Sequence, residues 1–255
     1  MIGPETLAYK RSGAGPTLVL LHPVGLDSDS WAAVMSGLQG LDIIAVDLPG
    51  HGGSKLNGSA TLNDFADRVA DLLLNLKVPL ATVAGLSCGG MVAQAVALRH
   101  PALVEKLVLC GCPATFPDQA RPAIASRGER AVADGMQAVI EETLQRWFTP
   151  DFIANGGAAP VAARLLADEP ETWAATWRAI SQLDHKAELS ALNVPVLCIA
   201  GELDQAVPPV MVKALADCIA GAEYRTLPGA PHMMQLEQPA ALVEQLRLFI
   251  ASDAF

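Results

Sequence analysis

The sequence predicts an α/β fold with a doubly wound, mostly parallel sheet of seven to eight strands and an inserted helical lid. Short apolar segments, typical of strands buried on both faces, alternate with longer segments of helical periodicity. This alternation is the pattern of a parallel sheet covered by helices. It stops between residues 116 and 189, where only helical segments occur, and then resumes. The 255 residues suffice for one α/β domain with a sizeable core.

The expected strands are short runs rich in Leu, Val, Ile and Ala that end in Gly, Pro or Asp. The segment at 17–21, Thr-Leu-Val-Leu-Leu, is a continuous apolar run, which indicates a strand covered on both faces. We expect strands at residues 7–10, 17–21, 43–46, 81–85, 107–109, 194–200 and 224–227.

The expected helices of the core lie between these strands and carry their own start signals. A cluster of Asp and Ser at 27–30 can cap the helix that carries Trp31, and Thr61 with Asp64 resembles a capping box. The helix after the fourth strand is apolar almost throughout, which indicates burial on most sides. Residues 240–250 are expected to form a closing amphipathic helix.

The interruption of the strand–helix pattern predicts the lid. Residues 130–148, 162–167 and 169–183 all have helical character with no strand between them. A purely helical block inserted in an α/β pattern is typical of a lid over a site. We therefore expect a core of residues 1–113 and 190–255 and a lid of residues 114–189.

Composition limits the partners and the compartment. The net charge of −10 argues against nucleic acid or an anionic membrane as a partner. No apolar run approaches the ~20 residues of a membrane span, and residues 1–5 lack the features of a signal peptide. The odd number of cysteines, five, fits a reducing compartment. We expect a cytoplasmic protein.

The fourth expected strand runs directly into a candidate nucleophile. Residues 85–89, Gly-Leu-Ser-Cys-Gly, fit G-x-S-x-G, a sharp strand-to-helix turn that exposes the serine hydroxyl. The turn would place Ser87 at the positive end of a helix, where developing negative charge is stabilised. By itself the motif also fits a glycine-rich turn without chemistry, so its partners decide the interpretation.

A serine hydroxyl needs a base to take its proton and a third group to orient that base. In open α/β sheets such groups lie in loops after the carboxyl ends of strands. Two such loops follow Ser87 in the chain, and they contain Asp204 and His232. We assign Ser87 as nucleophile, His232 as general acid/base and Asp204 as its orienting carboxylate. Glu202 competes with Asp204 for that role, and we prefer Asp204.

Two backbone amides are expected to stabilise the oxyanion. One is the N–H of Cys88, at the start of the helix, and the other is the N–H of Val24, in the loop His-Pro-Val-Gly at 22–25. The thiol of Cys88 has no base of its own, so we expect it to fill space.

The remaining histidines and cysteines are expected to be structural. His22 and His51 lie in Gly/Pro loops, which they are expected to hold by hydrogen bonds, and His185 follows the last lid helix. The Cys-Gly-Cys at 110–112 has no second Cys or His pair at ligand spacing. We therefore expect neither a metal nor a cofactor.

The lid offers candidate substrate contacts. Trp147 and Phe148 end the first long lid helix and are our candidates for apolar lining. Arg146 and Arg178 are cations that could meet a substrate carboxylate, and a solvated helix face explains each of them equally well. Two further tryptophans, four residues apart on one helix, indicate packing.

These residues together resemble the α/β-hydrolase family across nearly the whole chain, and within it the 3-oxoadipate enol-lactonases of aromatic catabolism. The resemblance to the family rests on residues 47–54, 85–89, 204, 208–209, 232 and 237–239, and that to the lactonases on 89–94, 100–101, 107–110, 135–136 and 146–150. Three features depart from the lactonase pattern: Cys88 stands where Met is usual, 22–25 replaces a Ser/Asn-rich loop, and 110–112 replaces Asn-Thr-Ala. All three border the expected pocket, so we expect them to bear on the substrate.

The resemblance and the candidate triad together imply a cofactor-free serine hydrolase that opens a small lactone or ester through an acyl-enzyme. An enol-lactone with a pendant carboxylate is the leading substrate. The alternatives are a broad carboxylesterase, a hydrolase of carbon–carbon bonds, and a binding protein that uses a hydrolase pocket as a receptor. A dehalogenase is disfavoured because position 87 is Ser and not Asp.

Overall fold

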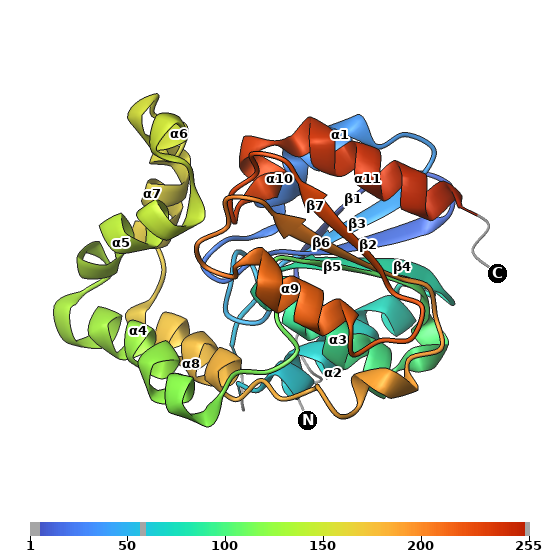
Figure 1. Ribbon diagram of the computed structural model, residues 1–255, viewed down its shortest axis with the longest axis horizontal. Coiled ribbons are helices and arrows are strands. Elements are labelled where there is room, and N and C mark those ends of the chain that lie inside the picture. The colour runs from blue at the N-terminus through green and yellow to red at the C-terminus, as the bar shows by residue number, and fades with distance from the viewer. Residues whose placement is uncertain (1–5, 57–59, 253–255) are drawn as a thin grey trace.

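Seven strands form one sheet in the computed structural model, which describes residues 6–56 and 60–252 (Figure 1). The strands are β1 Tyr9–Gly13, β2 Thr17–Leu21, β3 Asp42–Val46, β4 Ala81–Leu86, β5 Val104–Cys110, β6 Val196–Gly201 and β7 Glu223–Leu227. Their order across the sheet is β1-β3-β2-β4-β5-β6-β7. Only the β1–β3 pair is antiparallel. The predicted mostly parallel sheet is therefore confirmed.

The strand order reverses direction at β2, and this reversal places the site. Leu20 of β2 pairs with Ala45 of β3 on one side and with Ala84 of β4 on the other. The chain thus adds β3 on one side of β2 and β4 on the other. The loops after β2 and β4 therefore diverge from each other at the carboxyl edge of the sheet. In open α/β sheets ligands bind at such a switch point.

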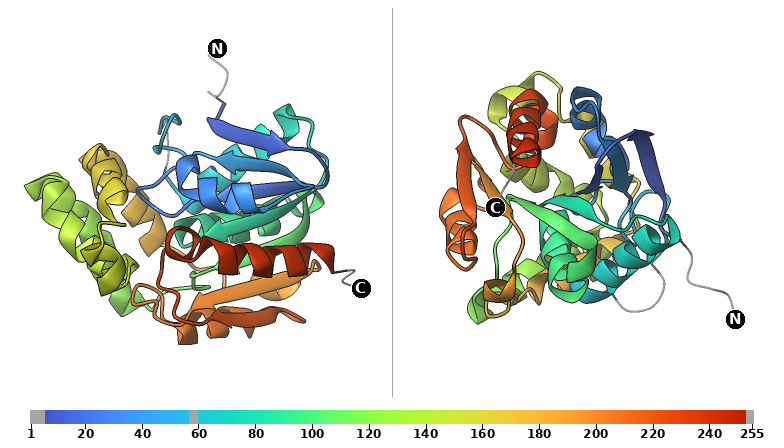
Figure 2. Two further views of the ribbon diagram at one scale, coloured as in Figure 1. Left: turned by 90° about the horizontal axis from the view of Figure 1, so that it is seen from above. Right: turned by 90° about the vertical axis from the view of Figure 1, so that its right-hand side faces the viewer.

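Helices cover both faces of the sheet (Figures 1 and 2). One face carries α1 Ala32–Gly37, α10 Met234–Glu237 and α11 Pro239–Ala251, and the other α2 Leu62–Asn75, α3 Cys88–Arg99 and α9 Pro209–Ala216. The capping box predicted at the start of α2 is present, since the Asp64 amide donates to Thr61 Oγ1 and the Thr61 amide donates to Asp64 Oδ2. The first ten residues of α3 are all buried, as its apolar sequence predicts.

Five helices between β5 and β6 form a helical insert beyond the carboxyl ends of the strands (Figure 1, left). They are α4 Arg121–Asp134, α5 Gln137–Trp147, α6 Pro150–Ala154, α7 Ala159–Leu166 and α8 Pro170–Ser181. An antiparallel bridge joins Thr115 to Asp184 where the chain leaves the core and returns to it. We propose the division into residues 114–189 and the two core segments on this arrangement.

The expectation of a single helix over residues 130–148 is wrong. The chain forms two helices there, because α4 ends at Asp134 and α5 begins at Gln137. Gly135 between them has φ +80°, a left-handed conformation that glycine adopts at little cost and that ends a helix. In addition, α4 begins nine residues earlier than expected, at Arg121, with Pro122 in its first turn.

The first strand is also displaced from its predicted position at 7–10. It spans Tyr9–Gly13, and all five of its residues are exposed. Because β1 lies at the edge of the sheet and buries no side chain in the core, the apolar residues of the sequence do not mark where this strand begins and ends.

Candidate active site

Ser87 occupies a strained turn between β4 and α3. Its φ of +55° and ψ of −118° place it in a backbone region that residues with a side chain rarely adopt. The turn is held from both sides, since the Ser87 amide donates to the Cys110 carbonyl at 2.9 Å and the Ser87 carbonyl accepts from the Met91 amide at 3.0 Å. Among the described residues other than glycine, only Lys77 shares a positive φ.

The glycines on either side of Ser87 are required by close backbone contacts. A Cβ atom at Gly85 would lie 2.1 Å from the carbonyl oxygen of Gly89. A Cβ atom at Gly89 would lie 2.1 Å from the carbonyl oxygen of Leu21. Neither backbone oxygen can move without displacing β2 or α3, so the spacing of the motif follows from the packing of this turn.

Asp204 and His232 form a buried hydrogen-bonded pair. They lie in the loops after β6 and β7, and His232 Nδ1 is 2.7 Å from Asp204 Oδ2. The other carboxylate oxygen, Oδ1, accepts hydrogen bonds of 2.8 Å from the amides of Ala206 and Val207. Because an ionised carboxylate only accepts hydrogen bonds, the shared proton resides on Nδ1 and leaves Nε2 as the free acceptor.

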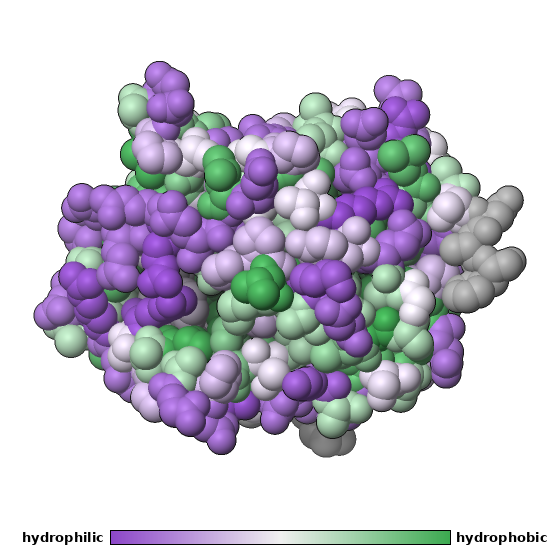
Figure 3. Space-filling view, viewed as in Figure 1, coloured by the Kyte–Doolittle hydropathy of each residue, from purple (hydrophilic) through white to green (hydrophobic). Residues whose placement is uncertain are grey.

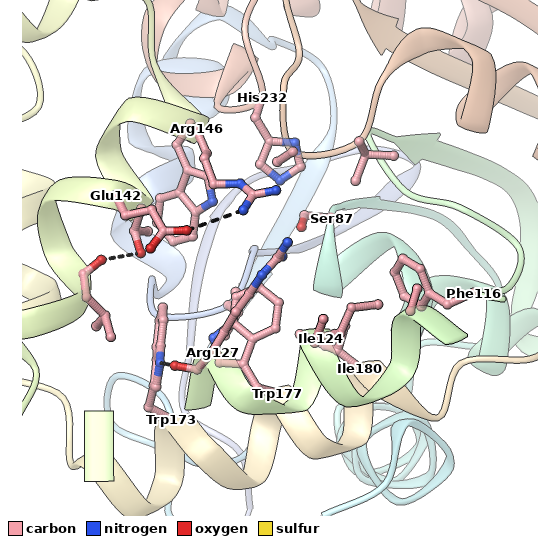
Figure 4. A pocket seen from close by; sticks show the side chains of 18 of the residues that line it. Ser87, Phe116, Ile124, Arg127, Glu142, Arg146, Trp173, Trp177, Ile180 and His232 are labelled. Carbon is pink, nitrogen blue, oxygen red and sulfur yellow. Dashed lines mark hydrogen bonds and ion pairs between the residues drawn. The ribbon is translucent and has the colours of Figure 1, made fainter. Parts of the chain in front are cut away.

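Ser87 and His232 face one cavity of about 260 Å³. In the close-up view the imidazole of His232 is directed toward Ser87 (Figure 4). Within the described ranges no hydrogen bond uses Ser87 Oγ, so this hydroxyl is free to turn toward the imidazole. The structure thus brings together the three residues that the sequence predicts as nucleophile, base and orienting carboxylate.

Glu202, the competing acid, lies elsewhere. Its Oε2 accepts a hydrogen bond of 2.7 Å from the Gly229 amide, and its side chain is exposed. It therefore braces the loop that leads to His232 without contacting the imidazole.

The Cys-Gly-Cys segment after β5 supports the buried pair. Gly111 has φ +49°, and a Cβ there would lie 3.2 Å from Asp204 Oδ2 and 3.4 Å from His232 Nδ1. Glycine therefore lets the backbone pack against this pair. Cys88 and Cys112 are fully buried; burial raises the pKa of both thiols, that of Cys88 to about 12. Neither thiol is a plausible nucleophile at neutral pH.

The two amides expected to stabilise an oxyanion are both available. Val24 lines the cavity beside Ser87, and Cys88 is the first residue of α3. In the part of the chain that the structure describes, neither N–H group takes part in a hydrogen bond. Both N–H groups are therefore free to donate to a ligand.

His22 holds the loop that presents Val24. Its Nδ1 donates to the Pro23 carbonyl at 2.8 Å, and its Nε2 accepts from the Leu48 amide at 2.9 Å. Complete burial lowers the pKa of His22 to about 4 and that of His51 to about 3, so both rings are neutral at pH 7. His51 Nδ1 lies 3.1 Å from the Pro49 carbonyl oxygen, so both histidines hold their loops as we expected.

The helical insert supplies most of the cavity wall. Its outer surface is largely hydrophilic (Figure 3), while several of its apolar side chains line the cavity. The large apolar residues of the wall are Val24, Met91, Phe116, Ile124, Val139, Trp147, Trp173, Trp177, Ile180, Val207 and Met211. The centre of the Trp147 ring lies 6.5 Å from that of His232. Trp173 and Trp177 pack edge to face, as expected, and also form part of this wall.

Two of the four predicted substrate contacts do not reach the cavity. Phe148 stacks on Phe152 with ring centres 5.1 Å apart and is absent from the wall. Arg178 lines a separate cleft that also contains Thr61 and His185. The helical sequence alone did not reveal which way α8 presents Arg178. His185 is buried and interacts with Gln94 through Nδ1 at 3.3 Å, so it too lies away from the cavity.

Three charged residues of the wall, Arg127, Arg130 and Glu142, escaped prediction. Arg127 points into the cavity from α4, and Glu142 lies on α5 beside Arg146 (Figure 4). Arg127 was missed because α4 was expected to begin only at residue 130. Pro122 is the signal that could have placed the start of this helix correctly.

Comparison with known proteins agrees with this geometry. The model of the alpha/beta hydrolase family matches residues 18–245. The chain belongs to this family.

Relatives within the family act on different substrates. The chain is 28% identical over 267 residues to a pimeloyl-[acyl-carrier protein] methyl ester esterase of Nitrosospira multiformis, covering 97% of this chain and 99% of the relative. It is 24% identical over 253 residues to 3-oxoadipate enol-lactonase 1 of Acinetobacter baylyi, covering 97% and 94%. The crystal structure of the enol-lactonase from Burkholderia xenovorans LB400 superposes with a TM-score of 0.91 at 29% identity, covering 96% of each chain. Esterases and lactonases thus both resemble this enzyme.

Across residues 6–56 and 60–252, no helix is both long enough and apolar enough to cross a bilayer.

Proposed function

We propose that this hydrolase opens a small lactone or ester through an acyl-enzyme on Ser87. The observation that carries the proposal is the buried His232–Asp204 pair at 2.7 Å, whose imidazole faces Ser87 across one cavity. A hydroxyl beside a base that is itself oriented by a carboxylate is the arrangement of an activated serine nucleophile.

In the first half-reaction, His232 Nε2 removes the hydroxyl proton as Ser87 Oγ attacks the carbonyl carbon. The carbonyl oxygen becomes an oxyanion, which accepts hydrogen bonds from the Val24 and Cys88 amides. The tetrahedral intermediate then collapses and the carbon–oxygen bond of the ester breaks. The leaving oxygen takes the proton from His232, and in a lactone it remains tethered to the acyl group.

In the second half-reaction, His232 removes a proton from water, and the hydroxide attacks the acyl carbon. Collapse of this intermediate returns the proton to Ser87 Oγ and releases the carboxylic acid. Asp204 stays ionised throughout and stabilises the imidazolium that forms in each half-reaction.

Among substrates, we propose a 3-oxoadipate-like enol-lactone of aromatic catabolism. Two of the relatives described above are enol-lactonases, and a cavity of about 260 Å³ suits a small molecule. A methyl ester carried on a protein is supported by the esterase relative. An acidic macromolecular partner is disfavoured, because the protein has a net charge of −10 and its insert (residues 114–189) has eleven acidic and seven basic residues. From the five cysteines, all free, we infer a cytoplasmic enzyme.

A substrate panel tests this proposal. We expect fast opening of enol-lactones, such as 3-oxoadipate enol-lactone, and slower cleavage of 4-nitrophenyl esters of graded chain length. Faster cleavage of the simple esters would instead identify a broad carboxylesterase. Absence of turnover on the whole panel would contradict the proposal and favour carbon–carbon bond hydrolysis or a receptor role.

A further inference from the structure

Arg127 is a cation in the wall of the cavity. Its guanidinium group points into the cavity on the side of Ser87 (Figure 4). Among the described residues no carboxylate forms an ion pair with it. The guanidinium lies over the face of the Trp177 ring, with its carbon 5.0 Å from the ring centre.

The other two arginines of the wall share one acid. Glu142 Oε2 lies 3.2 Å from Arg130 Nη1, and Glu142 Oε1 lies 3.5 Å from Arg146 Nη1. The three side chains carry a net charge of +1; Arg130 and Glu142 are exposed, and Arg146 is half-buried. Among the described arginines of the wall, Arg127 is therefore the one that forms no ion pair, although the charge of Glu142 acts on it from a longer distance.

A guanidinium packed on Trp177 without an ion-pair partner is costly, because burial removes part of its hydration. Burial and the positive charge of Arg146 lower the pKa of Arg127, and the negative charge of Glu142 offsets only part of this shift. A ligand carboxylate would relieve this cost, since charge-assisted hydrogen bonds to a guanidinium are strong and bidentate.

On the basis of the proposed function, we propose that Arg127 binds a carboxylate of the substrate. Glu142, with its negative charge, then restricts the cavity to substrates that carry one carboxylate. The predicted substrate class is a lactone or ester with a single negative charge on its acyl part. Arg146, predicted from sequence for this role, also lines the cavity, and there it forms an ion pair with Glu142.

The test compares two esters of similar length. Mono-4-nitrophenyl succinate carries one carboxylate, and 4-nitrophenyl pentanoate is neutral. Arg127→Gln should lower kcat/KM for the succinate ester by about tenfold or more while changing the pentanoate ester less than about twofold. Arg127→Lys should restore part of the loss. Arg178→Gln, on the same insert but facing another cleft, should leave both substrates unchanged.

The Glu142 part of the proposal has its own readout. Glu142→Gln should release Arg130 and Arg146 and raise kcat/KM for the 4-nitrophenyl monoester of tricarballylic acid, a dianion, by about threefold or more relative to the succinate ester. An unchanged ratio would overturn the role of Glu142. Thermal melts establish that each variant is folded.

Failure of this inference differs from failure of the proposed function. Equal losses on the neutral and the anionic ester in folded Arg127→Gln would overturn the carboxylate assignment but leave the hydrolase intact. Turnover of both esters that survives in Ser87→Ala would overturn the proposed function itself.

Discussion

The backbone carbonyl of Trp147 accepts a hydrogen bond of 3.0 Å from the amide of Met233, the residue that follows His232. Next to it, the Thr149 amide donates to Glu237 Oε2 at 3.1 Å, and the Thr149 hydroxyl donates to Oε1. The end of α5 is therefore fixed to the segment that carries the candidate base. We infer that the insert helps to position the imidazole as well as to cover the cavity.

Removing this connection should reduce turnover more than binding. Glu237→Ala deletes both hydrogen bonds to Thr149, so His232 should sample more orientations. We expect kcat to fall about tenfold for neutral and anionic substrates alike, with KM changed less than about twofold. Glu244→Ala, an exposed glutamate on α11, serves as the matched control. An equal fall in kcat for both variants would remove the positioning role.

Substitutions of Ser87 should separate activity from stability. Ser87→Ala should lose about 10³-fold or more of turnover while remaining folded. Ser87→Gly should be equally inactive but more stable than Ser87→Ala by about 1 kcal/mol, because glycine tolerates the positive φ at this position. Steady-state kinetics and thermal melts measure the two effects. Wild-type rates in either variant would end the nucleophile assignment.

The two acids after β6 should differ sharply in importance. Asp204→Asn removes the charge that stabilises the imidazolium, and we expect kcat/KM to fall about 10³-fold or more. Glu202→Gln disturbs only the contact with the Gly229 amide and should cost less than about threefold. Should Glu202→Gln be the more damaging of the two, the orienting carboxylate has been assigned to the wrong residue.

The buried histidines should make the protein less stable in mild acid. The pKa of His22 is about 4 in the folded protein, whereas its ordinary value, which applies to the unfolded chain, is 6.5. As the pH falls, the unfolded chain is therefore protonated before the folded protein. The free energy of unfolding should therefore decrease as the pH falls from about 7 to about 4, and this contribution should level off below.

The variant His22→Gln checks this dependence. It cannot be protonated, so urea unfolding at pH 7, 6, 5 and 4.5 should show a weaker loss of stability than in the wild type. An identical slope for both proteins would show that His22 does not titrate on unfolding.

The core of the site could be predicted because its residues follow strands. Ser87, Asp204 and His232 each come directly after a parallel strand, and the carboxyl ends of such strands meet at one edge. The backbone contacts that demand glycine at the nucleophile turn also leave a clear sequence pattern. Local rules therefore suffice for this part of the molecule.

The walls of the cavity could not be predicted in the same way. Arg127 and Arg178 both lie on helices of the insert, yet only the first faces the cavity. Which side a helix presents depends on how α4 and α8 pack together, and neighbouring apolar residues do not encode that choice locally. The break at Gly135 adds a change of direction that helical periodicity does not reveal.

The most direct test of the account is active-site labelling with diisopropyl fluorophosphate, followed by mass spectrometry. Attack of Ser87 Oγ on phosphorus would expel fluoride and leave one diisopropylphosphoryl group per chain. We predict a single adduct on the peptide that contains Ser87, formed in proportion to the loss of activity and absent in Ser87→Ala. An adduct on another residue that tracks the loss of activity, or full activity in the labelled enzyme, would contradict the account.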